Sequence, residues 1–346
     1  MKPEKNNNLS TKIIGITLGD PAGIGPECFF KSIYSKKKPN LVIISEEKLI
    51  KHLLKSLKIN IRLNVLESLK SFYIKEGYVN IFNPGIRPPL DISLNNIKAG
   101  YPSKDSAWYA FYSLKAATVL ALRKEIACLI TGPVCKETIQ KYILKTFKGH
   151  TEFFSKETQT DTVCMSFLTE ENIVGLATTH IPLKSVSHYL KIKDLKKKIL
   201  LLNSFGKSVF DNSSKFALLG LNPHSGENGL FGKEEQKIIK PLIDNLKKES
   251  IEIEGPFPAD AFWSSHNIYK RYKIIMALYH DQGLIPVKSG LLGKSVHITL
   301  GLPFLRLSVD HGTAFDIAGK NKASFLPTLH TIQTAESLIE KFENME

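Results

Sequence analysis

Hydrophobic and polar residues alternate along this chain in a pattern that predicts repeated strand–helix units. Short apolar runs rich in β-branched residues predict buried strands at 12–19, 41–45, 61–66, 78–82, 126–130, 162–168, 172–179, 216–223 and 273–279. Amphipathic segments predict helices at 26–35, 46–58, 103–124, 135–146, 183–209, 233–249 and 331–344. Because strands and helices follow one another in turn, the pattern favours mostly parallel, doubly wound α/β sheets.

Local signals refine this pattern. The polar residues 169–172 separate two strand-like runs and predict a hairpin, which adds one antiparallel pair to the sheet. Either Ser103 or Asp105 is placed to cap the long helix that follows. At 346 residues the chain exceeds the size at which one core stops growing, so we expect two domains after a disordered polar tail at 1–11.

Charge and cysteine content narrow the class of protein. The net charge of +14 comes almost entirely from lysine, and nucleic-acid recognition favours arginine, so we expect no nucleic-acid partner. The chain has no signal-peptide pattern and no run of about 18 apolar residues, from which we expect a cytoplasmic protein with no membrane segment. The cysteines form no CxxC pair, which favours reduced, mostly buried thiols at Cys28, Cys128, Cys135 and Cys164.

Three of the predicted strands lead directly to a histidine. These histidines follow the runs at 172–179, 216–223 and 273–279: His180, His224 and His280. Ligands of open α/β sheets bind at the carboxyl ends of the strands, and three imidazoles there could hold a divalent ion with one position left open. One such histidine alone is more often structural, but the shared placement of all three predicts a metal site.

The loop GDPAGIGPE at 19–27 follows the first predicted strand. Its glycines could bring backbone N–H groups close to an anion at a helix N-terminus. However, the spacing is not G-x-G-x-x-G, and two prolines remove donors. A ligand loop and a tight turn that needs glycine remain equally open, and the sequence assigns no residue to cofactor binding.

A helix start in the segment GHTEFF offers anion-binding groups. His150 and Thr151 stand where a hydroxyl and backbone donors can hold an anion. As an isolated motif this is a weak indication of function.

Arg306 lies in the apolar run 296–309, where an unpaired charge would be costly. Asp310 would be a structural partner for it. A substrate phosphate shared with Lys288 would be a functional partner, and the predicted metal site nearby favours that interpretation.

Seven motifs of this chain, in order, resemble the 4-hydroxythreonine-4-phosphate dehydrogenase family. They lie between residues 12 and 330: LGDPAGIGPE, ITGPVCKETI, GHTEFF, LNPHSGENGLFG, GPFPADAFW, YHDQGL and LGLPFLRLSVDHGTAFDIAG. The resemblance implies an oxidoreductase of pyridoxal 5′-phosphate (vitamin B6) biosynthesis that uses NAD or NADP.

The resemblance also implies roles for individual residues. The metal ligands would be His180, His224 and His280, and the substrate-binding residues would be His150, Thr151, Lys288, His297 and Arg306. Two positions depart from the family pattern. His297 stands where the family usually has asparagine, which puts one substrate contact in doubt, and Leu230 stands where members often have a histidine that is not a ligand.

The implied reaction is NAD-dependent oxidation of 4-phosphohydroxy-L-threonine to a β-keto acid, which decarboxylates to 3-amino-2-oxopropyl phosphate. One divalent ion, zinc, magnesium or cobalt, would bind the substrate alcohol and lower its pKa. Asp260 or Asp281 would remove the proton, although either could instead orient a histidine.

The implied fold is that of the isocitrate/isopropylmalate dehydrogenase type, with two α/β domains and the active site in the cleft between them. The first domain would comprise 12–138 plus 302–346, and the second 139–301 with the dimer interface. In the family, metal ligands come from both subunits of a homodimer. Two other functions stay open: a dehydrogenase of another phosphorylated hydroxy acid, such as erythronate or threonate 4-phosphate, and a non-enzymatic metal- or phosphate-binding regulator.

Overall fold

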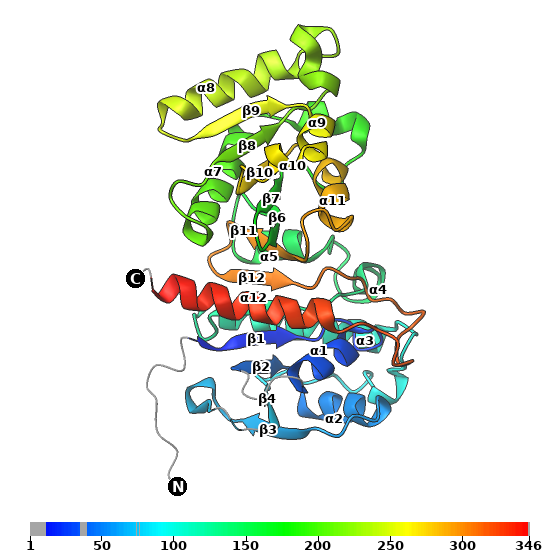
Figure 1. Ribbon diagram of the computed structural model, residues 1–346. Coiled ribbons are helices and arrows are strands. Elements are labelled where there is room, and N and C mark those ends of the chain that lie inside the picture. Colours follow the sequence, from blue (N-terminus) through cyan, green and yellow to red (C-terminus); the bar gives the residue numbers. More distant parts are fainter. Residues whose placement is uncertain (1–11, 35–39, 74, 76, 345–346) are drawn as a thin grey trace. The chain divides into compact units, whose positions relative to one another are not determined.

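The protein is described here by a computed structural model, which covers residues 12–34, 40–73, 75 and 77–344 (Figure 1). The tail predicted at 1–11 lies outside these residues. The chain forms two compact units, one of Met1–Gln159 with Leu302–Glu346 and one of Thr160–Gly301. Residues 139–159 belong to the first of these units. The predicted domain limits and the predicted cleft stay predictions.

The described part of the first unit contains parallel strands in the order β3-β4-β2-β1-β5-β12. Their bounds are β1 Ile14–Thr17, β2 Leu41–Ile44, β3 Arg62–Leu66, β4 Tyr78–Phe82, β5 Cys128–Thr131 and β12 Leu305–Ser308. The four residues of each of β1, β2 and β5 are all buried, as expected for parallel strands covered on both faces. The apolar run that contains Arg306 includes β12, which pairs in parallel with β5.

The α-helices of this unit are α1 Gly25–Tyr34, α2 Glu47–Ser56, α3 Lys104–Leu122, α4 Lys136–Tyr142, α5 His150–Glu157 and α12 Leu326–Glu343. Ser103 caps α3 through a reciprocal pair of hydrogen bonds with Ser106, so the alternative cap, Asp105, was wrong. Asp105 instead accepts a hydrogen bond from the backbone N–H of Ser93 (2.5 Å). Helix α12 begins at 326, earlier than predicted, because Pro327 fits the first turn of a helix.

The second unit contains the sheet β11-β6-β7-β10-β8-β9. Its strands are β6 Cys164–Thr169, β7 Ile173–Leu176, β8 Phe216–Leu219, β9 Ile253–Phe257, β10 Ile274–Ala277 and β11 Ser295–Leu300. Strands β7, β10, β8 and β9 are parallel, while β6 is antiparallel to both β7 and β11. The predicted hairpin is confirmed, and β6–β11 is a second antiparallel pair that was not predicted.

Helices cover both faces of this second sheet. Its α-helices are α6 Val186–Tyr189, α7 Ile192–Val209, α8 Lys240–Lys248, α9 Ala259–Ser264, α10 His266–Tyr269 and α11 His280–Lys288. Gly206 of α7 packs against Ile173, whereas Gly283 of α11 packs against Val174. Because neighbouring residues of a strand point to opposite faces, α7 and α11 lie on opposite sides of β7, which is the doubly wound arrangement predicted.

Two helices predicted in this unit differ in detail. The predicted helix 183–209 is interrupted, since Leu190 and Lys191 leave helical geometry between α6 and α7. The predicted helix 233–249 begins with a π-helical turn at Glu235–Ile239 before α8. Within the residues that the structure describes, no helix is long and apolar enough to cross a bilayer.

Candidate active site

The three predicted ligand histidines follow three neighbouring strands of the second unit. In the order β7-β10-β8 the strands run parallel, so their carboxyl ends meet at one edge. His180, His280 and His224 lie in the segments that follow these ends, after strands that stop at Leu176, Ala277 and Leu219. The fold therefore places these three histidines at one edge of the sheet, as the sequence predicted.

Two of these histidines lie close together. The ring centroids of His180 and His280 are 5.7 Å apart. Both rings border a pocket of about 250 Å³ that is also lined by Thr179, Tyr279 and Asp281. Within the described part of the chain, His224 does not join them, and no group of three histidine, cysteine or acidic residues is arranged to hold a metal ion.

Asp281 orients one of the two histidines. Its Oδ1 lies 2.7 Å from Nδ1 of His280, at the start of α11. A carboxylate on one ring nitrogen fixes the imidazole and leaves Nε2 as the nitrogen for a metal. This contact favours an orienting role for Asp281 over that of the base, whereas Asp260 is exposed in the first turn of α9. The donor set therefore suits a divalent ion, and one chain brings two of its three imidazoles together.

A buried network ties the ends of the three strands to one another. The Thr178 hydroxyl donates to Leu278 O (2.8 Å), which links the segments after β7 and β10. Gln282 accepts a hydrogen bond from Leu278 N (2.7 Å) and donates one to Gly220 O (2.6 Å), which links the segments after β10 and β8. Sequence reasoning missed Gln282, although its position two residues after His280 was a possible signal.

His224 begins an unusual backbone segment, which we call the left-handed turn and define as residues 224–228. All five residues have positive φ, between 39° and 78°, and only Gly226 is a glycine. Such a conformation costs about 1–2 kcal/mol for each non-glycine residue. His180 also has a positive φ of 43°, so two of the three predicted ligands are held in strained backbone.

Glu235 is a buried acid that anchors the residues leading into the left-handed turn. It is 1% exposed, and its Oε1 accepts hydrogen bonds from the backbone N–H groups of Leu221 and Asn222, both at 2.8 Å. Its Oε2 accepts a further bond from the Asn222 side chain (2.9 Å). Sequence reasoning missed this residue, because nothing local distinguishes it from the exposed acids around it.

The predicted phosphate-binding residues of the first unit form a second group. Arg306 is 1% exposed and donates from Nη2 to the Thr131 hydroxyl (2.7 Å). Its guanidinium lies 5.4 Å from the ring centroid of Phe154, and that ring stacks on His150 at 6.2 Å. Arg306 reaches Thr131 because it pairs in register with Leu129, so all three side chains point to the same face of the sheet.

Electrostatics at this group favour a neutral histidine. Burial, followed by the charges of Arg306 and Lys136, holds the pKa of His150 well below its usual value. The Nε2 atom of His150 is buried and makes no hydrogen bond with any residue that the structure describes. Burial also lowers the pKa of Arg306 to about 9, which leaves the guanidinium charged at neutral pH.

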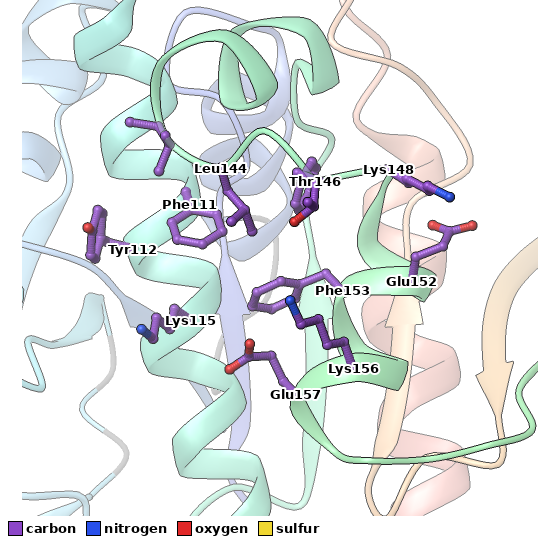
Figure 2. Close-up of a pocket in the computed structure, with 12 residues that line it drawn as sticks. Phe111, Tyr112, Lys115, Leu144, Thr146, Lys148, Glu152, Phe153, Lys156 and Glu157 are labelled. Carbon is purple, nitrogen blue, oxygen red and sulfur yellow. The ribbon is translucent and has the colours of Figure 1, made fainter.

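Helix α5, which carries His150 and Thr151, is packed on two sides. Its other side lines a second pocket, of about 230 Å³, together with α3 (Figure 2). Figure 2 shows Phe153 pointing into this pocket beside Phe111 and Leu144, with charged side chains around them. No predicted site residue lines this pocket.

The remaining predicted substrate residues lie in the second unit. His297 of β11 is 9% exposed, and its ring stacks on Phe167 with centroids 5.2 Å apart. Lys288 is the exposed last residue of α11.

The GDPAGIGPE loop of the first unit is closely packed. Gly19 has a φ of 77°, and a Cβ there would lie 2.2 Å from Pro133 O. The backbone N–H of Asp20 donates to the same carbonyl (2.8 Å). These contacts support the tight-turn interpretation of the loop.

Comparison with known proteins identifies the family. A protein of Aquifex aeolicus named 4-hydroxythreonine-4-phosphate dehydrogenase is 39% identical over 332 residues, which cover 95% of this chain and 99% of that protein. The crystal structure of 4-hydroxythreonine-4-phosphate dehydrogenase from Klebsiella pneumoniae matches with a TM-score of 0.84 and 32% identity, covering 96% of this chain and 99% of that one. A D-threonate 4-phosphate dehydrogenase of Pectobacterium atrosepticum is 35% identical over 334 residues, or 95% of this chain and 99% of that protein.

The fold and these relatives define a dehydrogenase built on mostly parallel α/β sheets. The family model of the pyridoxal phosphate biosynthetic protein PdxA matches residues 37–335, and the chain belongs to this family. The predicted family, fold class and enzyme class are thereby confirmed. The roles of individual residues, the metal and the homodimer stay predictions.

Proposed function

We propose that this enzyme oxidises 4-phosphohydroxy-L-threonine with NAD or NADP, giving a β-keto acid that decarboxylates to 3-amino-2-oxopropyl phosphate. The observation that supports this most is the near full-length match to relatives that carry this name, combined with the His180–His280 pair at a pocket on the carboxyl edge. A cytoplasmic location is part of the proposal.

His180, His280 and His224 would hold one divalent ion, zinc, magnesium or cobalt. His280 and His180 suit this role because they share a pocket, and Asp281 orients His280. Because His224 does not join them within one chain, we propose that a second copy in a homodimer completes the set. When bound, the ion would lower the pKa of the substrate hydroxyl, and the nicotinamide would accept the hydride.

The residues of this chain would orient the substrate and move its proton. His150, Thr151, Arg306 and Lys288 would bind the phosphate end, which fixes the reacting carbon. Asp260 is the remaining candidate for the base, since Asp281 already contacts His280.

A second candidate substrate is a four-carbon sugar acid phosphate, such as threonate or erythronate 4-phosphate. Two observations favour it: a relative named D-threonate 4-phosphate dehydrogenase, and His297 at the position of the family asparagine. An imidazole is bulkier than an amide and has a different donor pattern, so it could select an acid without the amino group.

Measuring NADH formation with each of the three phosphorylated acids, before and after removal of metal, tests the proposal. We expect the highest kcat/KM with 4-phosphohydroxy-L-threonine and loss of activity on chelation, with recovery on adding metal. A higher kcat/KM with threonate 4-phosphate would favour the second candidate, and His297→Asn should then shift the preference back. Absence of NADH with every acid would refute the dehydrogenase assignment.

A further inference from the structure

Lys136 has no predicted role, but it lies beside the predicted phosphate-binding residues His150 and Arg306 of the first unit. It is the first residue of α4, directly after the loop that leaves β5. Its Cε and Nζ lie 3.2 and 3.3 Å from the position that a Cβ on Gly149 would take. Because Gly149 is the N-cap of α5, the ammonium group stands next to the N-terminus that carries His150.

A chain of contacts connects this position to Arg306. Arg306 donates to Thr131 and lies over the ring of Phe154, and Phe154 stacks on His150. Lys136 lies near enough to His150 that its charge, like that of Arg306, lowers the pKa of the imidazole. Two cations thus lie near His150 at the start of α5, whose buried Nε2 atom makes no hydrogen bond within the described chain.

An acid, Glu152, also lies close to Lys136. The Oε2 of Glu152 lies 3.0 Å from the same Gly149 position, yet no ion pair joins Glu152 to Lys136 in the part of the chain that the structure describes. Gly149 has a φ of 155° and no side chain, which lets the Lys136 ammonium group come close to the backbone at the start of α5. Charge-assisted donors of this kind, arranged at a helix N-terminus, suit a phosphate dianion.

We propose that Lys136 binds the phosphate of the substrate, together with His150, Thr151 and Arg306. This inference rests on the proposed function, in which the substrate carries a phosphate. Lysine offers three donors on a flexible stem and can follow the phosphate, whereas the buried Arg306 is fixed by Thr131 and Phe154.

The test replaces Lys136 with methionine, which keeps the length of the side chain and removes the charge. Lys141→Met is the matched control, because Lys141 lies in the same helix, is exposed and stands over the ring of Tyr142. We expect Lys136→Met to raise KM for the phosphorylated substrate by about tenfold or more, with KM for NAD and Tm unchanged. Lys136→Arg should restore part of the loss, and Lys141→Met should behave as the wild type.

Binding of inorganic phosphate separates this inference from the proposed function. Added phosphate should shift the NMR signal of His150 in the wild type and in Lys141→Met. In Lys136→Met the affinity for phosphate, measured from the same signal, should be at least tenfold lower. This result would support the inference even if no phosphorylated acid were oxidised. Equal phosphate affinity in Lys136→Met and the wild type, or an unchanged substrate KM, would overturn it.

Discussion

Replacing Glu235 with glutamine tests how the left-handed turn is held. The four non-glycine residues of the turn cost on the order of 4–8 kcal/mol together. Glu235 offsets part of this cost, because hydrogen bonds to a charged group contribute about 1.5–3 kcal/mol each and its carboxylate accepts three. Glutamine keeps one acceptor oxygen, but its NH2 group faces the Asn222 amide that now donates to Glu235. With one bond lost and two weakened, we expect the free energy of unfolding to fall by about 2–4 kcal/mol.

Urea unfolding and hydrogen exchange measure this effect. The backbone amides of Leu221 and Asn222 should exchange faster in Glu235→Gln than in the wild type, because their acceptor is weakened. Asp244→Asn, at an exposed position of α8, makes the same change of charge and should leave both measurements unaltered. If Glu235→Gln and Asp244→Asn had the same unfolding free energy and the same exchange at 221–222, our account of the turn would be refuted.

Three further predictions concern the first unit. Arg306→Ala should raise KM for the phosphorylated substrate about tenfold or more, and it should also lower Tm because Thr131 loses its donor. Arg306→Lys should recover part of the loss in KM. A lowered Tm with an unchanged KM would contradict a phosphate-binding role for Arg306. The pKa of His150 is held below 6.5, so the neutral imidazole contributes stability above about pH 6.5, and this stability is lost as pH falls. His150→Gln should therefore flatten the acid side of the Tm–pH curve. Parallel curves for the variant and the wild type would count against this prediction. Burial raises the pKa of Asp20 to about 6 from 3.8, so its stabilising contribution is present below pH 3.8 and lost as pH rises through 6. Asp20→Asn should therefore be more stable than the wild type by about 2–3 kcal/mol at pH 8, and equal unfolding free energies there would show that the buried carboxyl is not strained.

The parts of the site that depend on short-range pattern could be predicted from the sequence. His180, His224 and His280 were placed correctly because each follows a buried strand, and the apolar periodicity defines those strands locally. The contact between Asp281 and His280 could also be predicted, because it joins two adjacent residues.

Long-range partners could not be predicted in this way. Gln282 donates to Gly220, 62 positions earlier in the chain, and Glu235 accepts from residues 13 and 14 positions before it. Buried polar side chains form hydrogen bonds with backbone N–H and C=O groups that the sheet itself leaves without a partner. The three-dimensional fold determines which of these groups lie next to one another.

Helix α11 shows how packing overrides local preference. Both Gly283 and Pro286 disfavour a helix interior, and no helix was predicted at 280–288. Gly283 is needed because a Cβ there would lie 2.6 Å from the Leu176 side chain, so close packing against β7 decides the conformation. His280 thus begins a helix, and the strand that it was expected to end stops at Ala277.

The strand order of the second unit has a consequence for biosynthesis. Strand β10 lies between β7 and β8, although the ribosome produces it after both. Until residues 274–277 emerge, β7 and β8 each expose an apolar edge without its native neighbour, and such edges are sites of aggregation. Non-local insertion of this kind is also slow. The sheet edge that carries His180 and His224 can therefore form only late in synthesis, and a nascent chain that stalls before β10 is a natural substrate for chaperones.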